Sequence, residues 1–358
     1  MKREFIDPWS SSMPEDYRKV AKRFGLEKFD VGDFPNPNVL MRRGFVFAGR
    51  DLKRISDCIK QRKSFYTLTG IMPTSDKVHF GTKSIIDLMV YFQKHGAETY
   101  VLVADLEAAA TRGIDLKEAK KTAIEIYIPC YIALGLDIRK TKFYFQSEKD
   151  DVRNLAFELS NKASLNEYKA IYGNAEPSRI MSSILQVADI LHPQIKKKMP
   201  GIIPVGIDQD PHIRLSRDIA SRAKKFDFFL PSSINVKFLP SLSGDLKMSK
   251  SEANSLYLLD SDEEIKRKVS KALTGGQKTA KEQEEKGGNP EKDMLFELFR
   301  QHLITDDREI KKREEDYREG KILDSENKEF AAKLLIKFMH DFNKKYKKAK
   351  KKVEKIFK

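Results

Sequence analysis

Between residues 64 and 207, short apolar runs with the length of buried strands alternate with segments whose apolar residues recur at helical spacing. The strand-like runs are 64–70, 98–106, 142–146 and 201–207, and the helix-like segments between them are 82–94 and 116–136. Parallel strands need a crossover connection, which is usually a helix, so this alternation predicts βαβ units. We therefore expect an α/β protein built on a doubly wound parallel sheet.

The remaining segments predict the domain organisation around that sheet. Residues 1–60 combine turn and chain-breaking residues with short helical patterns, and we expect an N-terminal extension that packs on a catalytic domain of residues 61–260. Residues 150–200 have a helical pattern and would form an insertion between the two halves of the sheet. Residues 261–358 are charged and helical, apart from a Gly-rich stretch at 274–288, which predicts a C-terminal α-helical domain.

Charge and composition narrow the function classes. The chain has 358 residues and a formal net charge of +15, which favours nucleic acid or an anionic membrane surface as a partner, although general solubility explains such an excess equally well. No apolar run approaches the roughly 20 residues that span a bilayer, and the N-terminus has no apolar signal core, so we expect a cytoplasmic protein. Cys58 and Cys130 lack a CxxC spacing and the six histidines form no ligand motif, so no protein-bound metal is expected.

The first candidate motif is His79-Phe80-Gly81-Thr82, which follows the first strand and its Gly70. In a doubly wound sheet this position binds nucleotides, at the carboxyl ends of the strands. Gly81 would let a phosphate approach the backbone, and His79 could donate a hydrogen bond to phosphate oxygens. An ordinary strand–helix turn that Thr82 caps is the alternative.

The second candidate motif is KMSKS at 247–251, preceded by Ser243-Gly244-Asp245. Two lysines and two serines on a loop flanked by glycine can reach a triphosphate and stabilise the charge that develops on the leaving group. A solvated basic turn is the alternative. Because this string is uncommon by chance, and because a nucleotide-binding motif precedes it in the same predicted sheet, we favour a joint ATP site.

HFGT and KMSKS together resemble the paired HIGH and KMSKS signatures of the class I aminoacyl-tRNA synthetases. GIDQDPHIR at 206–214 is similar to the signature of the tryptophanyl family, and FIDPW at 5–9, LMRRG at 40–44 and LTGGQKT at 273–279 resemble its archaeal and eukaryotic branch. The matches run from about residue 5 to residue 300, so the resemblance covers most of the chain.

The resemblance implies a Rossmann-like catalytic domain that uses ATP with Mg²⁺ to activate L-tryptophan and then charges tRNA(Trp). It also implies a homodimer without a membrane partner, in which residues 261–358 read the anticodon. The residues that it assigns to catalysis are His79, Thr82, Lys247 and Lys250. Those that it assigns to ATP binding are Gly70, His79, Gly81, Thr82, Asp208, Lys247, Met248, Ser249, Lys250 and Ser251.

Two positions depart from the family pattern. Thr82 stands where the second histidine of HIGH falls, and threonine is shorter and uncharged, although it can still donate one hydrogen bond. The loop before HFGT reads GIMPTS instead of a basic sequence, which removes one possible phosphate contact. Both departures bear on catalytic efficiency more than on family membership.

Activation of an amino acid requires an anchor for its ammonium group and a pocket for its side chain. Glu107, just after the second strand, can hold an ammonium group by a charge-assisted hydrogen bond, although an acidic residue in a first helical turn is an equally ordinary reading. Gln186 and Gln209 supply amides that donate and accept. The residues that match these three contact the amino acid in related synthetases.

The far end of the pocket concerns the indole ring. Asp189 lies three residues after Gln186 among apolar neighbours, and the matching aspartate of bacterial-type enzymes accepts the indole N–H. A helix-capping or ion-paired aspartate is the alternative. The tyrosine and glutamine that serve this end in eukaryotic enzymes fall at Leu68 and Leu102, whose side chains form no hydrogen bonds. We count Leu68 among the residues that bind tryptophan.

Other functions remain as alternatives at this point. A tyrosyl-tRNA synthetase has a similar glutamine and aspartate, but its phenol-binding tyrosine would fall at Leu68. A nucleotidyltransferase would not need about 100 helical residues after KMSKS, whereas Thr82 gives some weight to a non-catalytic paralogue. Nine lysines at 344–358, interspersed with apolar residues, predict a basic amphipathic helix that contacts tRNA phosphates or simply faces solvent.

Overall fold

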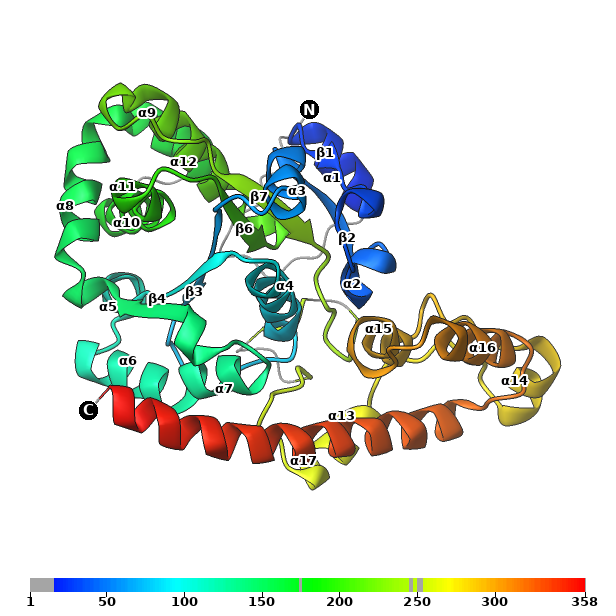
Figure 1. The fold of residues 1–358 in the computed structure, drawn as a ribbon. Helices are drawn as coiled ribbons and strands as arrows, with labels where there is room; N and C mark the ends of the chain where they lie inside the picture. The colour runs from blue at the N-terminus through cyan, green and yellow to red at the C-terminus, as the bar shows by residue number, and fades with distance from the viewer. Residues whose placement is uncertain (1–15, 174–175, 245–246, 250–253, 358) are drawn as a thin grey trace.

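The computed structural model describes residues 16–173, 176–244, 247–249 and 254–357, and it is built around a seven-stranded sheet (Figure 1). The strand order across the sheet is β1-β2-β7-β6-β3-β4-β5. The strands are β1 (Glu27–Lys28), β2 (Val46–Arg50), β3 (Tyr66–Ile71), β4 (Glu98–Val103), β5 (Thr141–Phe145), β6 (Gly201–Val205) and β7 (Ser232–Val236).

The five strands from β7 to β5 are parallel, with β3 at their centre. The chain adds β4 and β5 on one side of β3 and then returns to add β6 and β7 on the other side. The order therefore reverses between β3 and β6, and this reversal creates a crevice at the carboxyl ends of the two strands. The expected doubly wound α/β fold is confirmed.

The sheet edge formed by β1 and β2 was not predicted. Residues 1–60 were expected to contribute only turns and short helices. β2 pairs antiparallel with β7, and β1 pairs antiparallel with β2. Glycine weakens a strand pattern, yet Gly49 lies within β2 because a Cβ there would be 2.3 Å from the backbone oxygen of Ser233. The close approach of two strands explains this glycine.

Helices cover both faces of the sheet (Figure 1). One face packs Ile71, Val101 and Val103 into a core that continues into the C-terminal helices. The helices on this face are α4 (Thr82–Lys94), α6 (Leu116–Thr122), α7 (Ile128–Ala133) and α17 (Asp324–Ile356), and α3 (Leu52–Lys60) packs nearer β7. The helix expected at 116–136 is α6 and α7 joined by a π-helical turn at 123–127.

The other face carries Leu68, Tyr100 and Leu102, which pack against Ile190 and Ile213. The expected helical insertion covers part of this face. Its helices are α8 (Asp150–Leu159), α9 (Leu165–Tyr172), α10 (Pro177–Leu191) and α11 (Pro193–Lys196). The helix α12 (Asp210–Arg222), which follows β6, packs against them. The short α5 (Asp105–Arg112) follows β4, where the sequence pattern extended the strand to residue 106.

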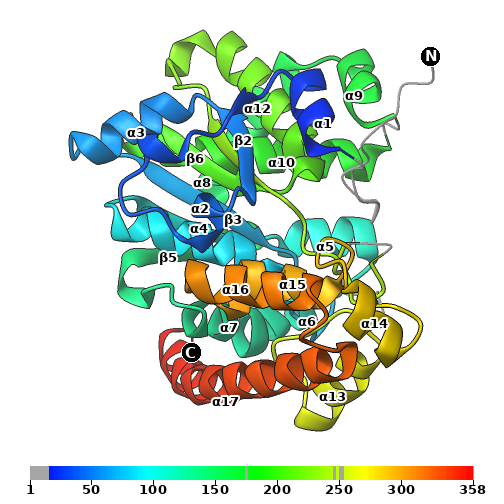
Figure 2. The ribbon, with the colours of Figure 1, turned by 90° about the vertical axis from the view of Figure 1, so that its right-hand side faces the viewer.

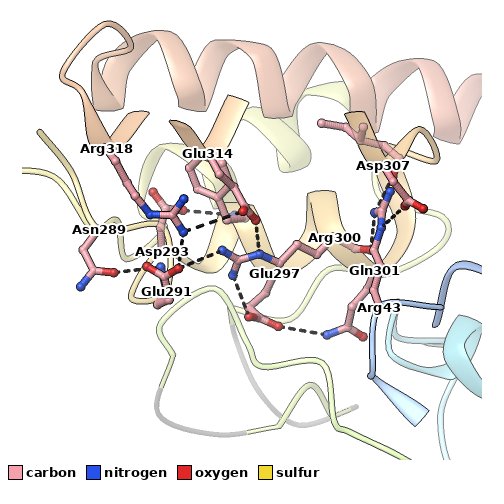
Figure 3. A network of polar contacts seen from close by, with 12 residues as sticks. Arg43, Asn289, Glu291, Asp293, Glu297, Arg300, Gln301, Asp307, Glu314 and Arg318 are labelled. Carbon is pink, nitrogen blue, oxygen red and sulfur yellow. Dashed lines mark hydrogen bonds and ion pairs between the residues drawn. The ribbon is translucent and has the colours of Figure 1, made fainter. Parts of the chain in front are cut away.

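The C-terminal helices include α13 (Asp262–Ser270), α14 (Ala280–Lys286), α15 (Met294–Leu298) and α16 (Asp307–Arg318), which lie beside α17 (Figure 2). Arg43, just after α2 (Val39–Arg42), ties them to the N-terminal part of the chain (Figure 3). Its guanidinium group donates to Asp307 at 2.7 Å and to the carbonyl oxygens of Arg300 and Ile304 at 2.7 and 2.8 Å. Arg300 in turn pairs with Glu314, so the contact leads into an ionic network.

The lysine-rich tail is the last part of α17, and its apolar face is buried. Ala349 and Val353 are buried, and the ring of Phe357 packs edge-on against Phe143 and Phe145 of β5. The tail thus packs on the sheet as well as forming part of the C-terminal helices. No helix among the described residues is both long enough and apolar enough to cross a bilayer.

Candidate active site

A cleft of about 950 Å³ opens at the carboxyl ends of β3, β4 and β6, where the strand order reverses. Its walls come from these strands, from the first turns of α4, α5 and α12, and from α10. The expected site residues that line it are Leu68, Gly70, His79, Gly81, Thr82, Glu107, Gln186, Asp208, Gln209, Lys247, Met248 and Ser249. Lys250 and Ser251 lie outside the described residues.

The two signature motifs meet through backbone pairing. His79 forms an antiparallel bridge with Tyr257, and the Phe80 N–H donates to the Leu256 carbonyl at 2.7 Å. The segment after KMSKS is therefore fixed beside HFGT. A Cβ on Gly81 would lie 3.1 Å from the His79 ring and 3.6 Å from Cβ of Met248, so glycine suits this crowded junction.

Thr82 is the first residue of α4, and Gly81, which has no side chain, occupies the N-cap position. The alternative reading of Thr82 as the helix cap is therefore wrong. Its Oγ1 lies 3.5 Å from Nε2 of His79, and both residues line the cleft at the positive end of a 13-residue helix. Helix N-termini favour anions, because their backbone N–H groups point outward.

Lys247 forms an ion pair with Asp208, from the turn between β6 and α12. The distance from Nζ to Oδ2 is 2.6 Å, and Nζ lies 4.9 Å from the centre of the Phe238 ring. The chain must pass close beneath Phe238 here, since a Cβ on Gly206 would lie 2.4 Å from that ring. This crowding explains the glycine that opens the GIDQDPHIR segment.

Glu107 lies in the first turn of α5, and Gln186 and Gln209 face the same cleft from α10 and from the turn before α12. Burial raises the pKa of Glu107 to about 7, although the positive charge of Arg112 opposes this shift. A buried carboxylate is stabilised in its ionised form by a cationic partner, because the opposite charge offsets the cost of removing it from water. The three side chains form a polar set suited to an amino acid head group.

Asp189 differs from the other expected residues, because it is not among the described residues that line the cleft. It is fully buried, and its two oxygens accept hydrogen bonds from the Tyr144 hydroxyl at 2.8 Å and the Gln146 amide at 2.7 Å. Three residues advance a helix by about 300°, so Asp189 is turned about 60° away from Gln186. That turn directs Asp189 toward β5, and within the described part of the chain it neither caps a helix nor pairs with a cation.

Several polar residues of the cleft were not predicted from the sequence, among them Gln146 and His212. Gln146 ends the expected strand 142–146, and it shares a strand face with Tyr144 at the edge where ligands bind, which is the signal that could have found it. His212 lies in the first turn of α12, with Nδ1 2.8 Å from the Tyr172 hydroxyl, and burial lowers its pKa to about 4. Its neutral form is therefore the stable one near neutral pH.

This arrangement of fold and motifs agrees with the comparisons to known proteins. The family described as "tRNA synthetases class I (W and Y)" matches residues 60–340. "Tryptophan--tRNA ligase" from Methanocaldococcus jannaschii is 39% identical over 360 residues, covering 98% of this chain and 97% of the relative. The relative of the same name from Aeropyrum pernix is 39% identical over 363 residues, with 98% and 97% covered.

Solved structures agree. The tryptophanyl-tRNA synthetase from Aeropyrum pernix K1 has a TM-score of 0.90 at 38% identity, with 98% of both chains covered. The enzyme from Plasmodium falciparum has a TM-score of 0.84 at 27% identity, with 93% of this chain and 94% of that chain covered. The chain therefore belongs to the class I tRNA synthetases of the tryptophan and tyrosine family, which are ATP-using ligases. Within this family it is a member of the tryptophan--tRNA ligases.

Proposed function

We propose that this chain activates L-tryptophan with ATP, releases pyrophosphate, and transfers the tryptophanyl group to the 3′ end of tRNA(Trp) for protein synthesis. The observation that supports the proposal is that one cleft is lined by two sets of residues, one suited to phosphate and one suited to an amino acid. We assign the first set, at the start of α4 and Lys247, to a phosphate-binding end, and the second set, Glu107, Gln186 and Gln209, to an amino acid-binding end.

At the first end, we assign ATP binding to His79, Thr82 and the KMSKS loop. Gly70 and Gly81 leave room beside the nucleotide, and His79 and Thr82 donate to phosphate oxygens at the helix N-terminus. The ammonium group of Lys247 neutralises the negative charge that develops on the leaving pyrophosphate. Asp208, Met248, Ser249, Lys250 and Ser251 complete the proposed set, with Mg²⁺ bound as part of the ATP substrate.

At the second end, Glu107 binds the ammonium group of tryptophan, and the amides of Gln186 and Gln209 orient the amino acid. Leu68 and Leu102 offer apolar surface to the indole ring and no hydrogen bond to a phenol. A site built for a tyrosine hydroxyl needs such a partner, because discrimination by a hydrogen bond can reach about 10⁴-fold. The cleft therefore supports tryptophan over tyrosine.

The chemistry requires positioning more than proton transfer. A carboxylate oxygen of tryptophan forms the new bond to the α-phosphorus, while the bond from that phosphorus to the bridging oxygen breaks and its electron pair leaves with pyrophosphate. The tRNA hydroxyl then attacks the tryptophanyl carbonyl, its proton is lost to the departing phosphate or to water, and AMP leaves. Because the carboxylate nucleophile of the first step is already ionised, orientation and stabilisation of phosphate charge supply the catalysis of that step.

The proposal extends to the partners. We assign residues 261–358 to anticodon recognition and the lysine-rich end of α17 to tRNA phosphates, and we propose a homodimer. Translation takes place in the cytoplasm, and the proposed reaction would place the chain there. The phosphate contacts would provide affinity, whereas recognition of the tRNA(Trp) sequence needs contacts to bases.

ATP–pyrophosphate exchange with each of the twenty amino acids tests the function directly. We expect exchange with tryptophan and a far lower rate with tyrosine, followed by charging of tRNA(Trp). Faster exchange with tyrosine than with tryptophan would overturn the proposed specificity. An absence of exchange with every amino acid would instead indicate a non-catalytic paralogue.

A further inference from the structure

A cluster of three polar side chains lies behind the amino acid end of the cleft. Tyr144, Asp189 and Gln146 form a hydrogen-bonded chain in which the carboxylate of Asp189 accepts from both of the others. Asp189 is fully buried and Gln146 is 1% exposed. Only Gln146 of the three is among the described residues that line the cleft.

Only one of the two polar atoms of the Gln146 amide has a hydrogen-bond partner among the described residues. Its Nε2 donates to Oδ2 of Asp189 at 2.7 Å, whereas its Oε1 is buried and has no hydrogen-bond partner among the described residues. Buried polar atoms are nearly always paired, so an orphaned acceptor at the wall of a binding cleft needs an explanation. A ligand that brings one N–H donor into the cleft would supply the missing partner.

Asp189 fixes which end of the Gln146 amide is free. Burial raises the pKa of Asp189 to about 7. Above that pH the ionised carboxylate only accepts hydrogen bonds, so it selects the NH₂ end of the amide and leaves the carbonyl oxygen for other partners. The Tyr144 hydroxyl donates to the second oxygen of Asp189 and holds the carboxylate in place. The two donors together satisfy the buried carboxylate without a cation.

The backbone of Gln146 is also held. The Arg153 guanidinium donates to the Gln146 carbonyl at 3.0 Å, and the backbone N–H of Ser147 donates to the buried Asp105 at 3.1 Å. Both ends of the side chain are therefore anchored before a ligand binds, which reduces the entropy that binding must overcome.

The walls beside Gln146 are apolar. Leu68, Leu102 and Ile190 belong to one buried cluster that Tyr144 packs against, and all three line the cleft. Phe145 pairs with Val103 and ends β5, so Gln146 begins the 3-10 turn that follows, and its amide and the Tyr144 hydroxyl both reach Asp189. A flat apolar ring that carries a single N–H matches this combination of walls and acceptor.

We propose that Oε1 of Gln146 accepts the indole N–H of tryptophan, and that Asp189 is a positioning residue that orients the Gln146 amide. This inference rests on the proposed function, and it replaces direct acceptance of the indole N–H by Asp189. It assigns the specificity for the indole nitrogen to a residue after β5, whereas Gln186 and Asp189 both lie on α10.

The test compares tryptophan with 3-benzothienylalanine, in which sulfur replaces the indole N–H and the ring shape is kept. We measure kcat/KM for both substrates in ATP–pyrophosphate exchange, with the full chain and with Gln146→Leu. The wild type prefers tryptophan, and we expect Gln146→Leu to reduce that preference roughly 10- to 100-fold, because the variant lacks the acceptor. Circular dichroism and the Tm of Gln146→Leu show whether the variant is folded, and its kcat/KM with benzothienylalanine is the reference for the ratio.

Two further variants make the test specific. Asp189→Asn can donate to Oε1 of Gln146 and turn the amide around, so it should also lose the preference for tryptophan. Gln93→Leu removes another buried glutamine, which bonds to Thr141 and to the backbone of Asp137, and it should lower stability while keeping the preference.

An unchanged preference in Gln146→Leu would overturn the assignment, and so would a wild type that uses both substrates equally well. If Gln146→Leu were too unstable to assay, Gln146→Met would keep the length of the side chain without its acceptor and is read in the same way. If the wild type showed no exchange with tryptophan, the proposed function itself would fail, which is a separate outcome.

Discussion

Nζ of Lys247 and Oδ2 of Asp208 lie 2.6 Å apart, although 39 residues separate them in the chain. Only 16% and 13% of the two side chains are exposed, so solvent and salt screen their attraction less than that of a surface pair. The pair holds the first lysine of KMSKS beside the residues that begin α4. The position of Lys247 in the cleft is thus set by a carboxylate as well as by its own loop.

Replacing Lys247 by alanine tests its role in catalysis. We expect Lys247→Ala to lower kcat of ATP–pyrophosphate exchange by about 10²- to 10³-fold, because one preorganised charge opposite the leaving group is lost. The Kd for tryptophan, measured by calorimetry, should change little. Lys53→Ala, at a side chain that is 82% exposed, is the matched control and should behave like the wild type. Equal loss in both variants would contradict the role of Lys247.

Thr82 allows a gain-of-function test. Thr82→His restores the second histidine of the family pattern, and we expect it to keep or raise the adenylation rate, since the position faces the phosphate-binding end of the cleft. Thr82→Val removes the hydroxyl with little change of shape and should lower the rate. Single-turnover measurement of adenylate formation distinguishes these cases. A large loss in Thr82→His would mean that threonine makes a contact that histidine cannot replace.

The raised pKa of Glu107 predicts a pH dependence of tryptophan binding. Burial moves this pKa to about 7, so the carboxylate is mainly protonated below pH 7 and ionised above it. Only the ionised form attracts the ammonium group, and the affinity for tryptophan should therefore rise as the pH increases through 7. We expect Kd to fall severalfold between pH 6 and pH 8, with at most tenfold per pH unit for one titrating group.

Glu107→Gln is the control for that experiment, because its amide does not titrate. It should bind tryptophan more weakly at pH 8 and show a much flatter profile from pH 6 to pH 8. Asp189 also has a pKa raised to about 7 by burial, so a slope that survives in Glu107→Gln would point to Asp189 instead of Glu107.

The strands that the sequence predicted correctly have a common feature, which is their apolar sequence. Strands β3, β4 and β6 are buried along almost their whole length, so they appear as continuous apolar runs. The edge strand β5 is partly exposed, yet it retains an aromatic run. β7 has the sequence SSINV and buries both serines, while β2 contains Gly49, so neither strand shows that pattern. Local sequence cannot predict pairing that is fixed by close backbone contact between distant segments.

The candidate site also contains residues that local sequence predicts and residues that it does not. Residues in local motifs, such as His79 and Lys247, can be found from spacing, because a strand–helix turn and its loop set their position. The direction in which the Asp189 side chain faces depends instead on how α10 is rotated against β5, and no local sequence pattern predicts that rotation. The position of Gln146 at the end of a predicted strand indicates a cleft residue, but its role depends on the hydrogen bond to Asp189, which no local pattern predicts.

The contact between Arg43 and the C-terminal helices predicts a stability difference between adjacent arginines. Arg43 is 11% exposed and donates to Asp307 and to two backbone carbonyls, whereas Arg42 is 38% exposed and shares only the bond to Asp307 across this contact (Figure 3). Arg43→Ala should cost about 2 kcal/mol or more and lower the Tm by several degrees. Arg42→Ala should shift the Tm much less, and equal shifts would refute the distinction.

The lysine-rich end of α17 has two roles that different variants separate. Its apolar face packs through Val353, and Phe357 contacts the rings on β5. Truncation before residue 344 should therefore lower the Tm, and any effect on tRNA would be ambiguous. Neutralisation to glutamine leaves the packed face intact. The suitable positions are the exposed Lys344, Lys345, Lys347, Lys348, Lys351 and Lys352.

If these lysines contact tRNA phosphates, the neutralised chain should have a higher KM for tRNA(Trp) and an unchanged rate of tryptophan-dependent exchange. Each lost phosphate contact should also reduce the dependence of log KM on log salt concentration by somewhat less than one unit, because fewer counterions are released. Aminoacylation at 50 and 200 mM salt measures both quantities. A variant that neutralises only Lys351 and Lys352 is compared with one that neutralises the exposed Lys53 and Lys60 of α3, because each removes two positive charges, and an equal effect in both would exclude a specific role of the tail.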